Sequence, residues 1–312
     1  TNQSIDFLRN PARDAAIGLD GVYSNPAGVA FLPEGFHLGF NWQYAHQTRT
    51  INTSNPDFAY GRKNNGATTK TYEGVADAPI IPSIQAAYNK GDWSFQLNFS
   101  IPGGGGKCEF ENGLGSFESV VAGIDRQLGG LSTQLNSSLP QPVLPVAAGY
   151  DMDSYMQGRQ YYFGFQVGAA YKVNDNLSVY GGLRLLYGDA TYKAKINNIR
   201  VYDTNNTAYD FGQYLDNLAP YAAAALQQVE AGIAQYQNAG VEVPQSLIES
   251  QRGLQSFQTL QVYREGVNLQ CDQSGLGIAP VLGIDYKVGN FNFAAKYEFK
   301  TQIHMKNEST VN

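Results

Sequence analysis

The sequence predicts an all-β fold, a transmembrane antiparallel β-barrel, on three observations. Apolar and polar residues alternate with a period of two over long segments, which places each set on one face of a sheet. One short sequence motif, the repeated phrase, occurs three times. In each copy an apolar run ends in Tyr, and a tight polar turn leads into a second alternating run. The connections between the predicted strands are alternately long and short, as in barrels with short turns at one rim and long loops at the other.

The composition is consistent with this fold class. Only 15% of the 312 residues are charged, and the mean hydropathy is -0.33. Soluble domains carry about 25% charged residues, and no segment approaches the ~20 apolar residues of a spanning helix. Barrel strands account for both values, because apolar residues face outward and small or polar residues face inward. The net charge of -6, without a basic patch, argues against a nucleic-acid partner.

Seven strands can be placed from the alternation and the turns. The apolar set of the first strand is strongly aromatic, with Phe40, Trp42 and Tyr44 alternating with polar residues and Gly. In a soluble sandwich this face would be the core, whereas in a barrel it faces lipid. The predicted strands are 36–48, 79–89, 92–102, 158–173, 176–200, 274–287 and 290–306.

The repeated phrase fills the three short connections, which follow Tyr88, Tyr171 and Tyr286. Their Gly, Asn and Asp residues tolerate the positive φ of tight turns. The aromatic residues on either side are typical of a membrane–water interface. We therefore expect these turns at the periplasmic rim and long extracellular loops at about 49–78, 103–157 and 201–273.

The long loops have helical periodicity. Apolar residues recur at helical spacing in 114–135 and in 213–236, and Pro244 is suited to open a further short helix. Two interpretations remain open. The helices only pack on each other, or they form an apolar platform on which a hydrophobic ligand first lands.

The third predicted strand ends in Pro102 and the glycines 103–106. Because Pro and Gly weaken strand pairing, a departure from regular pairing in the barrel wall is one interpretation. A simple strand end that runs into a loop is the interpretation we favour from sequence.

Catalytic and metal signals are weak. The three histidines are far apart in sequence, and Gly103–Lys107 lacks the Ser or Thr and the helix of a phosphate loop. We expect no catalytic residue, no metal and no cofactor. Cys108 and Cys271 are the only cysteines. In an oxidising compartment they are either disulfide-bonded or two free thiols, and the sequence does not decide between these.

The segment before the first strand carries a family resemblance. It contains Asn25-Pro26-Ala27 within the run 23–32, and an Arg-Asp-Ala-Ala-Ile-Gly-Leu-Asp-Gly stretch begins at Arg13. This segment resembles the N-terminal hatch of the FadL/OmpP1/TodX family of outer-membrane transporters of hydrophobic compounds, and 283–297 resembles a strand–turn–strand of that family. The resemblance implies a hatch plug at 1–35 and a barrel at 36–312.

For function, the resemblance implies uptake of long-chain fatty acids or aromatic hydrocarbons across a bacterial outer membrane. Ligand would be captured by the loops, bind in the lumen and leave laterally after a hatch shift. The expected partners are a hydrophobic ligand (fatty acid, aromatic or detergent), outer-membrane lipid and lipopolysaccharide, around a monomeric barrel. The alternatives are a plugged general porin, a structural outer-membrane barrel and a lipase-type enzyme, for which no nucleophile–base set is visible.

Arg184 faces the lumen by alternation and is the candidate for binding a ligand carboxylate. The alternative is that lumenal charges, Lys296, Glu298 and Lys300 among them, form an internal ion-pair ladder. Four apolar residues of the N-terminal segment would line the pocket or wedge the plug: Phe7, Leu8, Phe31 and Leu32.

The family barrel has fourteen strands, twice the number predicted here. Seven strands with exposed edges are costly in lipid, because unpaired backbone groups have no water to bond with. We therefore expect this chain to be the N-terminal part of a longer protein.

Overall fold

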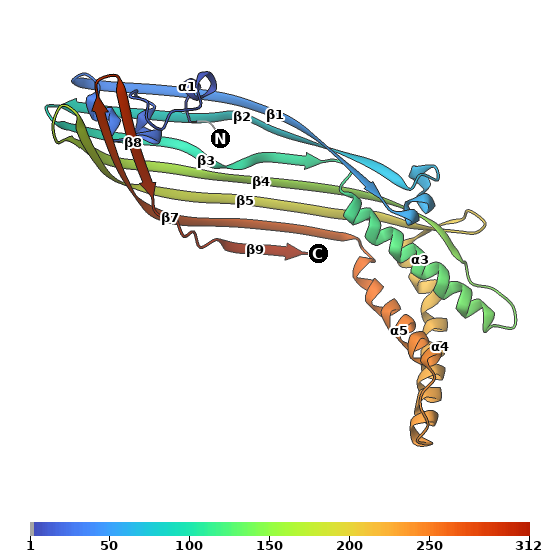
Figure 1. Cartoon of the computed structure of the whole chain (residues 1–312). Helices are drawn as coiled ribbons and strands as arrows, with labels where there is room; N and C mark the ends of the chain where they lie inside the picture. Colours follow the sequence, from blue (N-terminus) through green and yellow to red (C-terminus); the bar gives the residue numbers. More distant parts are fainter. Residues whose placement is uncertain (1–2) are drawn as a thin grey trace.

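The computed structural model describes residues 3–312 and is dominated by one curled antiparallel sheet (Figure 1). Strand order in the sheet follows the chain, β1-β2-β3-β4-β5-β7-β8, with short β6 on β5 and β9 on β7. The predicted antiparallel sheet of seven principal strands, a partial barrel, is confirmed. The strands are β1 (Gly35–Ser54), β2 (Thr69–Lys90), β3 (Trp93–Phe110), β4 (Ala147–Lys172), β5 (Leu177–Asp203), β6 (Ala208–Asp210), β7 (Val267–Val288), β8 (Phe291–Glu298) and β9 (Lys306–Val311).

Three tight hairpins lie together at one end of the sheet (Figure 1). They join β2 to β3, β4 to β5 and β7 to β8. Gly91 and Gly289 sit in the first and third turns with φ of 58° and 57°, which L side chains rarely adopt. The first and third turns therefore use their glycines as the sequence predicts. The second turn, 173–176, has no residue with positive φ; there Asn174 Oδ1 accepts from the backbone N–H groups of Asn176 and Leu177 at 2.9 and 2.8 Å.

The strands extend further from the hairpins than predicted. β1 continues to Ser54 and β3 to Phe110, so the connections at that end begin later than expected. Their outer halves carry polar residues on both faces, which removes the apolar alternation by which strands are recognised. The predicted strand 290–306 is interrupted: β8 and β9 pair with different parts of β7, and 299–305 lie between them.

The two faces of the sheet are inverted relative to a soluble protein. On the outer face large apolar side chains are exposed, and Phe40 and Phe293 are 68% and 60% accessible. On the inner face polar side chains are buried: Gln85, Gln96, Asn98, Gln166, Ser178 and Asp285 are each at most 5% accessible. Exposing apolar area to water costs roughly 25 cal/mol per Å², so the outer face requires an apolar surrounding.

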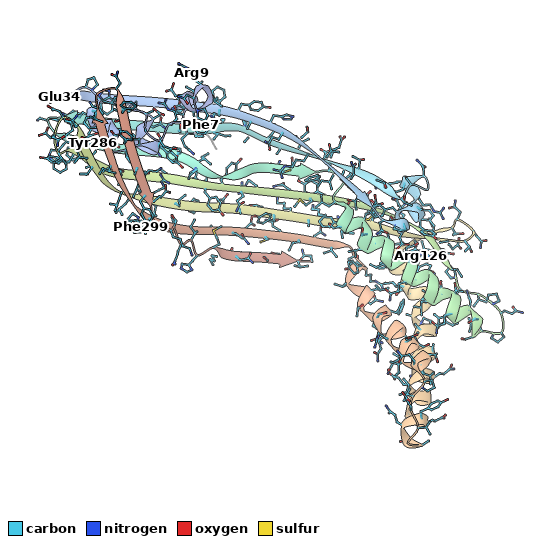
Figure 2. All side chains as sticks on the ribbon, in the orientation of Figure 1. Phe7, Arg9, Glu34, Arg126, Tyr286 and Phe299 are labelled. Atoms are coloured by element: carbon cyan, nitrogen blue, oxygen red, sulfur yellow. The ribbon has the colours of Figure 1, made fainter. Side chains whose placement is uncertain are left out.

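The N-terminal segment contains α1 (Ile5–Arg9), α2 (Gly21–Ser24) and the 3-10 turn η1 (Gly28–Phe31), and residues 3–34 contain no strand. It lies at the hairpin end, against the inner face (Figure 1). Figure 2 shows Phe7 and Glu34 at this end and Arg126 at the opposite end.

The helices predicted in the long connections are confirmed as α3 (Gly115–Ser137), α4 (Phe211–Asn238) and α5 (Gln245–Thr259). They lie at the end opposite the hairpins, and α4 and α5 project beyond the sheet (Figure 1). Their apolar faces share one buried cluster with the sheet, including Leu128, Leu215, Phe257 and Val201. Within residues 3–312 no helix has the length and apolar character needed to cross a membrane. Short 3-10 turns accompany them, η2 (Pro56–Tyr60), η3 (Arg62–Asn64) and η4 (Leu260–Tyr263).

The disulfide alternative for Cys108 and Cys271 is wrong, because both thiols are free. Cys108 on β3 pairs with Gly158 on β4, Gly158 with Tyr192 on β5, and Tyr192 with Cys271 on β7. The two cysteines therefore occupy one row but lie three strand spacings apart, about 14 Å at ~4.8 Å per strand. A disulfide needs a Cα separation below about 7 Å.

Candidate functional site

The inner face of the sheet holds the N-terminal segment through side chains that donate to its backbone carbonyls. Gln96 Nε2 lies 2.7 Å from the carbonyl oxygen of Pro26, and Ser178 Oγ lies 2.7 Å from that of Ala27. Because these donors come from different strands, they fix the segment's position across the sheet. Further donors to the segment's carbonyl oxygens are Ser83, Gln85, Asn89, Gln166, Asn292 and Lys296.

Asn25 joins this segment to the wall by its side chain. It is 2% exposed, and its Nδ2 donates to Asp285 Oδ2 of β7 at 2.5 Å. Its Oδ1 accepts from the backbone N–H of Gly28 at 3.3 Å, which holds the turn into η1. Asn292 Nδ2 of β8 donates to the same Asp285 oxygen at 2.9 Å. The Asn-Pro-Ala segment thus docks through a buried carboxylate that accepts from two amides.

Asp285 is fully buried, and its Oδ1 has no hydrogen-bond partner among the described residues. Gly28 packs directly against it, since a Cβ there would lie 2.9 Å from Asp285 Oδ2. A side chain larger than Gly at this position would push the 3-10 turn away from β7.

Arg184 faces the lumen, as predicted, and is 2% exposed. Its guanidinium forms an ion pair with Glu298 of β8 and donates from Nε to Gln166 Oε1 at 3.1 Å. Its Cζ also lies 4.7 Å from the centroid of the Tyr23 ring. These neighbours occupy the guanidinium that was predicted to bind a ligand carboxylate.

Lys296 completes this cluster from β8. Its Nζ donates to the Tyr23 carbonyl oxygen at 2.9 Å, lies 3.6 Å from Glu298 Oε2 and sits 4.8 Å above the Tyr23 ring. Lys296, Glu298 and Arg184 therefore form a lumenal ion-pair network. The ladder given as the alternative from sequence is present only in part, because Lys300 is exposed and forms no ion pair within residues 3–312. The network extends to Arg184 of β5 and holds Tyr23 between two cations.

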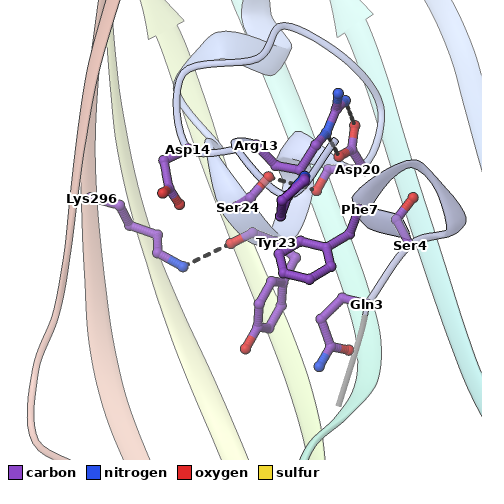
Figure 3. A pocket seen from close by; sticks show the side chains of 10 residues that line it. Gln3, Ser4, Phe7, Arg13, Asp14, Asp20, Tyr23, Ser24 and Lys296 are labelled. Carbon is purple, nitrogen blue, oxygen red and sulfur yellow. Dashed lines mark hydrogen bonds and ion pairs between the residues drawn. The ribbon is translucent and has the colours of Figure 1, made fainter. Parts of the chain in front are cut away.

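A pocket of about 180 Å³ lies between the N-terminal segment and this network (Figure 3). Phe7 and Tyr23 supply its aromatic wall, and Lys296 reaches it from β8. Arg13 and Asp20 form a bidentate ion pair at 2.7 Å on another side. Its lining residues are Gln3, Ser4, Phe7, Pro11, Arg13, Asp14, Asp20, Tyr23, Ser24 and Lys296.

The other predicted apolar residues lie outside this pocket. Leu8 follows Phe7 on α1 but is 68% exposed. Phe31 lies beneath Lys287, with Nζ 4.2 Å from its ring centroid, and Leu32 packs with Val22 and Val29. Alternation places Gln96 and Gln166 on the inward face, but the sequence did not predict that they and Asp285 hold the N-terminal segment. Long polar side chains at inward positions of apolar strands were the available signal.

The wall between β2 and β3 has an irregular stretch. The ladder pairs Asp77 with Lys107 and then resumes only at Ile84 with Phe99, so 78–83 and 100–106 are not paired there. The favoured simple strand end after Pro102 is wrong, because β3 continues through the glycines to Phe110. Gly104 takes a φ of 102° and passes so close to β4 that a Cβ would lie 2.3 Å from the Gln160 carbonyl oxygen.

Apolar contacts, in place of ladder hydrogen bonds, close this stretch of wall. Ala78, Ile81 and Ile101 are buried together, with Tyr161 and Phe163 packed against them. Three prolines, Pro79, Pro82 and Pro102, remove backbone donors here. Separating β2 from β3 here would therefore break few backbone bonds.

At the helical end, Glu118 of α3 joins several elements. It is 4% exposed, and it accepts from Asn64 at 2.6 Å, Lys70 at 2.7 Å, Tyr72 at 2.6 Å and Tyr150 at 3.1 Å. Burial opposes ionisation, but these donors outweigh it and hold the pKa of the Glu118 carboxyl below its usual value.

Asp125 lies two turns further along α3, and its pKa is shifted in the opposite direction from that of Glu118. It is 2% exposed, its Oδ1 has no partner among the described residues, and burial raises its pKa to about 7. Arg126 and the backbone N–H of Gly149 oppose this shift but do not cancel it.

We expect Asp125 to make the fold less stable as pH rises. The folded pKa of about 7 exceeds the ordinary value of 3.8, so the folded state binds the extra proton between these values. The free energy of unfolding should fall across that window by about 4 kcal/mol at most. Asp125→Asn should remove the slope, as measured by denaturant unfolding from pH 4 to 8. An unchanged slope in the variant would contradict the assignment.

The helices α4 and α5 enclose an apolar hollow of about 230 Å³. It is lined by Ala222 and Leu226 of α4 and by Leu254 and Phe257 of α5. In residues 3–312 no three His, Cys, Asp or Glu side chains gather as a metal site.

The fold and the site together define a partial β-barrel with an apolar outer face and a plugged inner face. No protein-family model matches the sequence. No curated protein sequence matches it either. The structure is similar to the toluene transporters TodX of P. putida and TbuX of Ralstonia pickettii, each 14% identical to this chain.

The alignment covers 94% of this chain and 58% of TodX, with a TM-score of 0.41, and 95% of this chain and 56% of TbuX, with a TM-score of 0.45. Ail, the attachment invasion locus protein of Yersinia pestis, aligns over 86% of this chain and 100% of its own, at 10% identity and a TM-score of 0.17. The likeness concerns the strand arrangement alone. The chain spans less than two thirds of the two transporters.

Proposed function

We propose that this chain belongs to an outer-membrane channel for small hydrophobic molecules, with residues 1–35 as its hatch. The observation that carries the proposal is the distribution of side chains over the two faces of the sheet. Apolar side chains such as Phe40 are exposed on the outer face, and polar ones such as Gln96 are buried on the inner face. A sheet with this distribution is stable when lipid covers the outer face. The hatch fills the inner face, which favours a gated route over an open pore.

The ligand would pass through three places. The hollow between α4 and α5 is apolar and stands beyond the sheet, so it is suited to capture from outside. The pocket under Phe7 and Tyr23 is the lumenal site. The irregular stretch between β2 and β3 is the lateral exit, because Ile101 and its apolar neighbours close it without ladder hydrogen bonds.

The pocket favours a single aromatic ring over a long-chain fatty acid. Its volume is about 180 Å³, and a cavity of ~150 Å³ accommodates benzene. Arg184 is already paired with Glu298 and Gln166, so a carboxylate would have to displace one of them. We therefore propose a neutral aromatic compound of the size of toluene as cargo.

Phe7→Asp should weaken toluene binding about tenfold, because a ring contact worth ~1.5–3 kcal/mol is lost and a charge enters the pocket. Leu8→Asp is the matched control: it makes the same change one residue along α1, on an exposed side chain. Binding is measured by titration calorimetry on reconstituted protein.

Equal losses in the two variants would contradict the lumenal site. Tighter binding of hexadecanoate than of toluene, abolished by Arg184→Ala, would favour a fatty-acid carrier instead. Swelling of liposomes in small sugars with the hatch intact would favour a general porin.

A further inference from the structure

A buried carboxylate lies without a cation where the N-terminal segment meets β7 and β8. Asp285 is 0% exposed, and its Oδ2 accepts from the side-chain amides of Asn25 and Asn292. Its Oδ1 has no partner among the described residues. A buried carboxylate is strongly unfavourable unless a positive charge or a full set of donors compensates it. Two neutral amides on one oxygen compensate the charge of Asp285 only in part.

The cationic side chains nearby are engaged elsewhere. Lys287 follows two residues along β7, and its Nζ lies 4.2 Å from the centroid of the Phe31 ring. Lys296 Nζ lies 3.6 Å from Glu298 Oε2. Within residues 3–312 Asp285 takes part in no ion pair shorter than 4.0 Å. The protein itself therefore supplies no counter-charge to this carboxylate.

A second buried oxygen without a partner belongs to the same group of side chains. Asn292 Nδ2 donates to Asp285 Oδ2 at 2.9 Å and to the carbonyl oxygen of Ala15 at 2.7 Å. Asn292 Oδ1 is buried and has no partner among the described residues. The two oxygens without partners, on Asp285 and on Asn292, therefore belong to one hydrogen-bonded pair of side chains. Acceptors outnumber donors at this place.

We propose that Asp285 Oδ1 and Asn292 Oδ1 bind a monovalent metal cation that fastens the N-terminal segment to the sheet. Carboxylate and amide oxygens are the ligands that hard cations take. One carboxylate balances one positive charge, whereas a divalent ion would leave a net positive charge buried. Asn89 Oδ1 and Gln96 Oε1 are also buried without a partner, but they are neutral, so a water molecule is sufficient for them. A water molecule at Asp285 would leave its charge uncompensated.

The cation would enter from the lumenal pocket. Asp14 and Ser24 line that pocket and directly precede Ala15 and Asn25 in the chain (Figure 3). The docked segment covers the site, since a Cβ on Gly28 would lie 2.9 Å from Asp285 Oδ2. Because the site is closed off only while the segment is docked, a bound cation should stabilise the docked state.

The test measures amide hydrogen exchange, followed by mass spectrometry, in peptides from 10–32 of the reconstituted chain. The wild type is compared in sodium chloride and in choline chloride at equal ionic strength, because choline is too large for a buried site. With sodium at about ten times its Kd, exchange should be about tenfold slower than in choline, because cation binding lowers the released fraction by that factor. Peptides from β4 and β5 should exchange equally in the two salts.

Asp285→Asn should exchange at the same rate in both salts, because it removes the charge that holds the cation. Asp175→Asn is the control of equal charge change, on an exposed carboxylate of the second hairpin turn, and it should keep the sodium effect. Asn292→Asp places a second carboxylate at the site, so calcium should now slow exchange as sodium does in the wild type.

Equal exchange of the wild type in the two salts would overturn the site, and so would a sodium effect that persists in Asp285→Asn. A lack of protection of Asn292→Asp by calcium would contradict the role of Asn292 as a ligand. None of these measurements uses a hydrophobic ligand, so the inference does not depend on the proposed function. Toluene binding, measured in choline chloride, tests that function separately.

Discussion

Asn25→Asp is expected to release the N-terminal segment from the inner face of the sheet. The substitution places a second carboxylate where Asn25 Nδ2 now donates to Asp285 Oδ2 at 2.5 Å. Both groups are buried, Asn25 at 2% and Asp285 at 0% exposure. Two buried like charges at this separation cannot both ionise without cost, and the docking should weaken by roughly 3–5 kcal/mol.

The release would be measured by amide hydrogen exchange, followed by mass spectrometry of peptides from 10–32. Exchange in these peptides should rise in Asn25→Asp, while peptides from β4 and β5 should exchange as in the wild type. The decisive control is the swap, Asn25→Asp with Asp285→Asn, which restores one carboxylate and one amide in exchanged positions. If the swap exchanges as fast as the single variant, the contact does not hold the segment.

Glu118→Ala is expected to loosen α3 from the sheet. Removal of the carboxylate leaves four buried or partly buried donors, on Asn64, Lys70, Tyr72 and Tyr150, without their acceptor. An unsatisfied donor costs ~1–3 kcal/mol, and the loss of a paired buried charge about 3–5 kcal/mol. The free energy of unfolding of the helical end should fall by about 3–5 kcal/mol.

Exchange of amides in 115–137 reports this change directly. Glu111→Ala is the matched control. Glu111 and Glu118 both line a hollow of about 420 Å³ at the helical end, but Glu111 is exposed, so its loss should change stability by less than ~0.5 kcal/mol. Equal effects of the two substitutions would contradict the role of Glu118.

The lowered pKa of the Glu118 carboxyl also makes the free energy of unfolding depend on pH in the acid range. Its folded pKa is lowered, so its contribution is present above the unfolded value of ~4.3. The contribution is lost as pH falls through the folded pKa. Glu118→Gln should remove this acid-dependent loss. Asp125 acts in the opposite direction, so the two carboxylates of α3 should be separable by pH.

The strand pattern was predictable because it depends on local chemistry. Alternation along 93–101 follows from a sheet whose faces meet different surroundings, and Gly91 and Gly289 are required by turns that need positive φ. Helical periodicity likewise located α3 and α4. The limits of the strands were less predictable, because beyond the apolar band a polar strand and a polar loop have similar compositions, as at 49–54 and 103–110.

The site was predictable only in part. Asn25 and the inward position of Arg184 came from sequence, but the partners of both lie on strands far along the chain. Asp285 is 260 residues from Asn25, and Glu298 is 114 residues from Arg184. Register across several strands brings them together, and no local pattern encodes it.

By itself the sequence determined which residues face outward and which turns close the hairpins, because period-two alternation and turn chemistry act within a few residues. The tertiary structure decided what the inward residues do. It directed Gln96, Ser178 and Asp285 toward the N-terminal segment, paired Arg184 with Glu298 and kept Cys108 apart from Cys271. The physical reason is that hydrogen bonds and ion pairs act over ~3 Å, and only the curvature and register of the whole sheet set distances on that scale between distant parts of the chain.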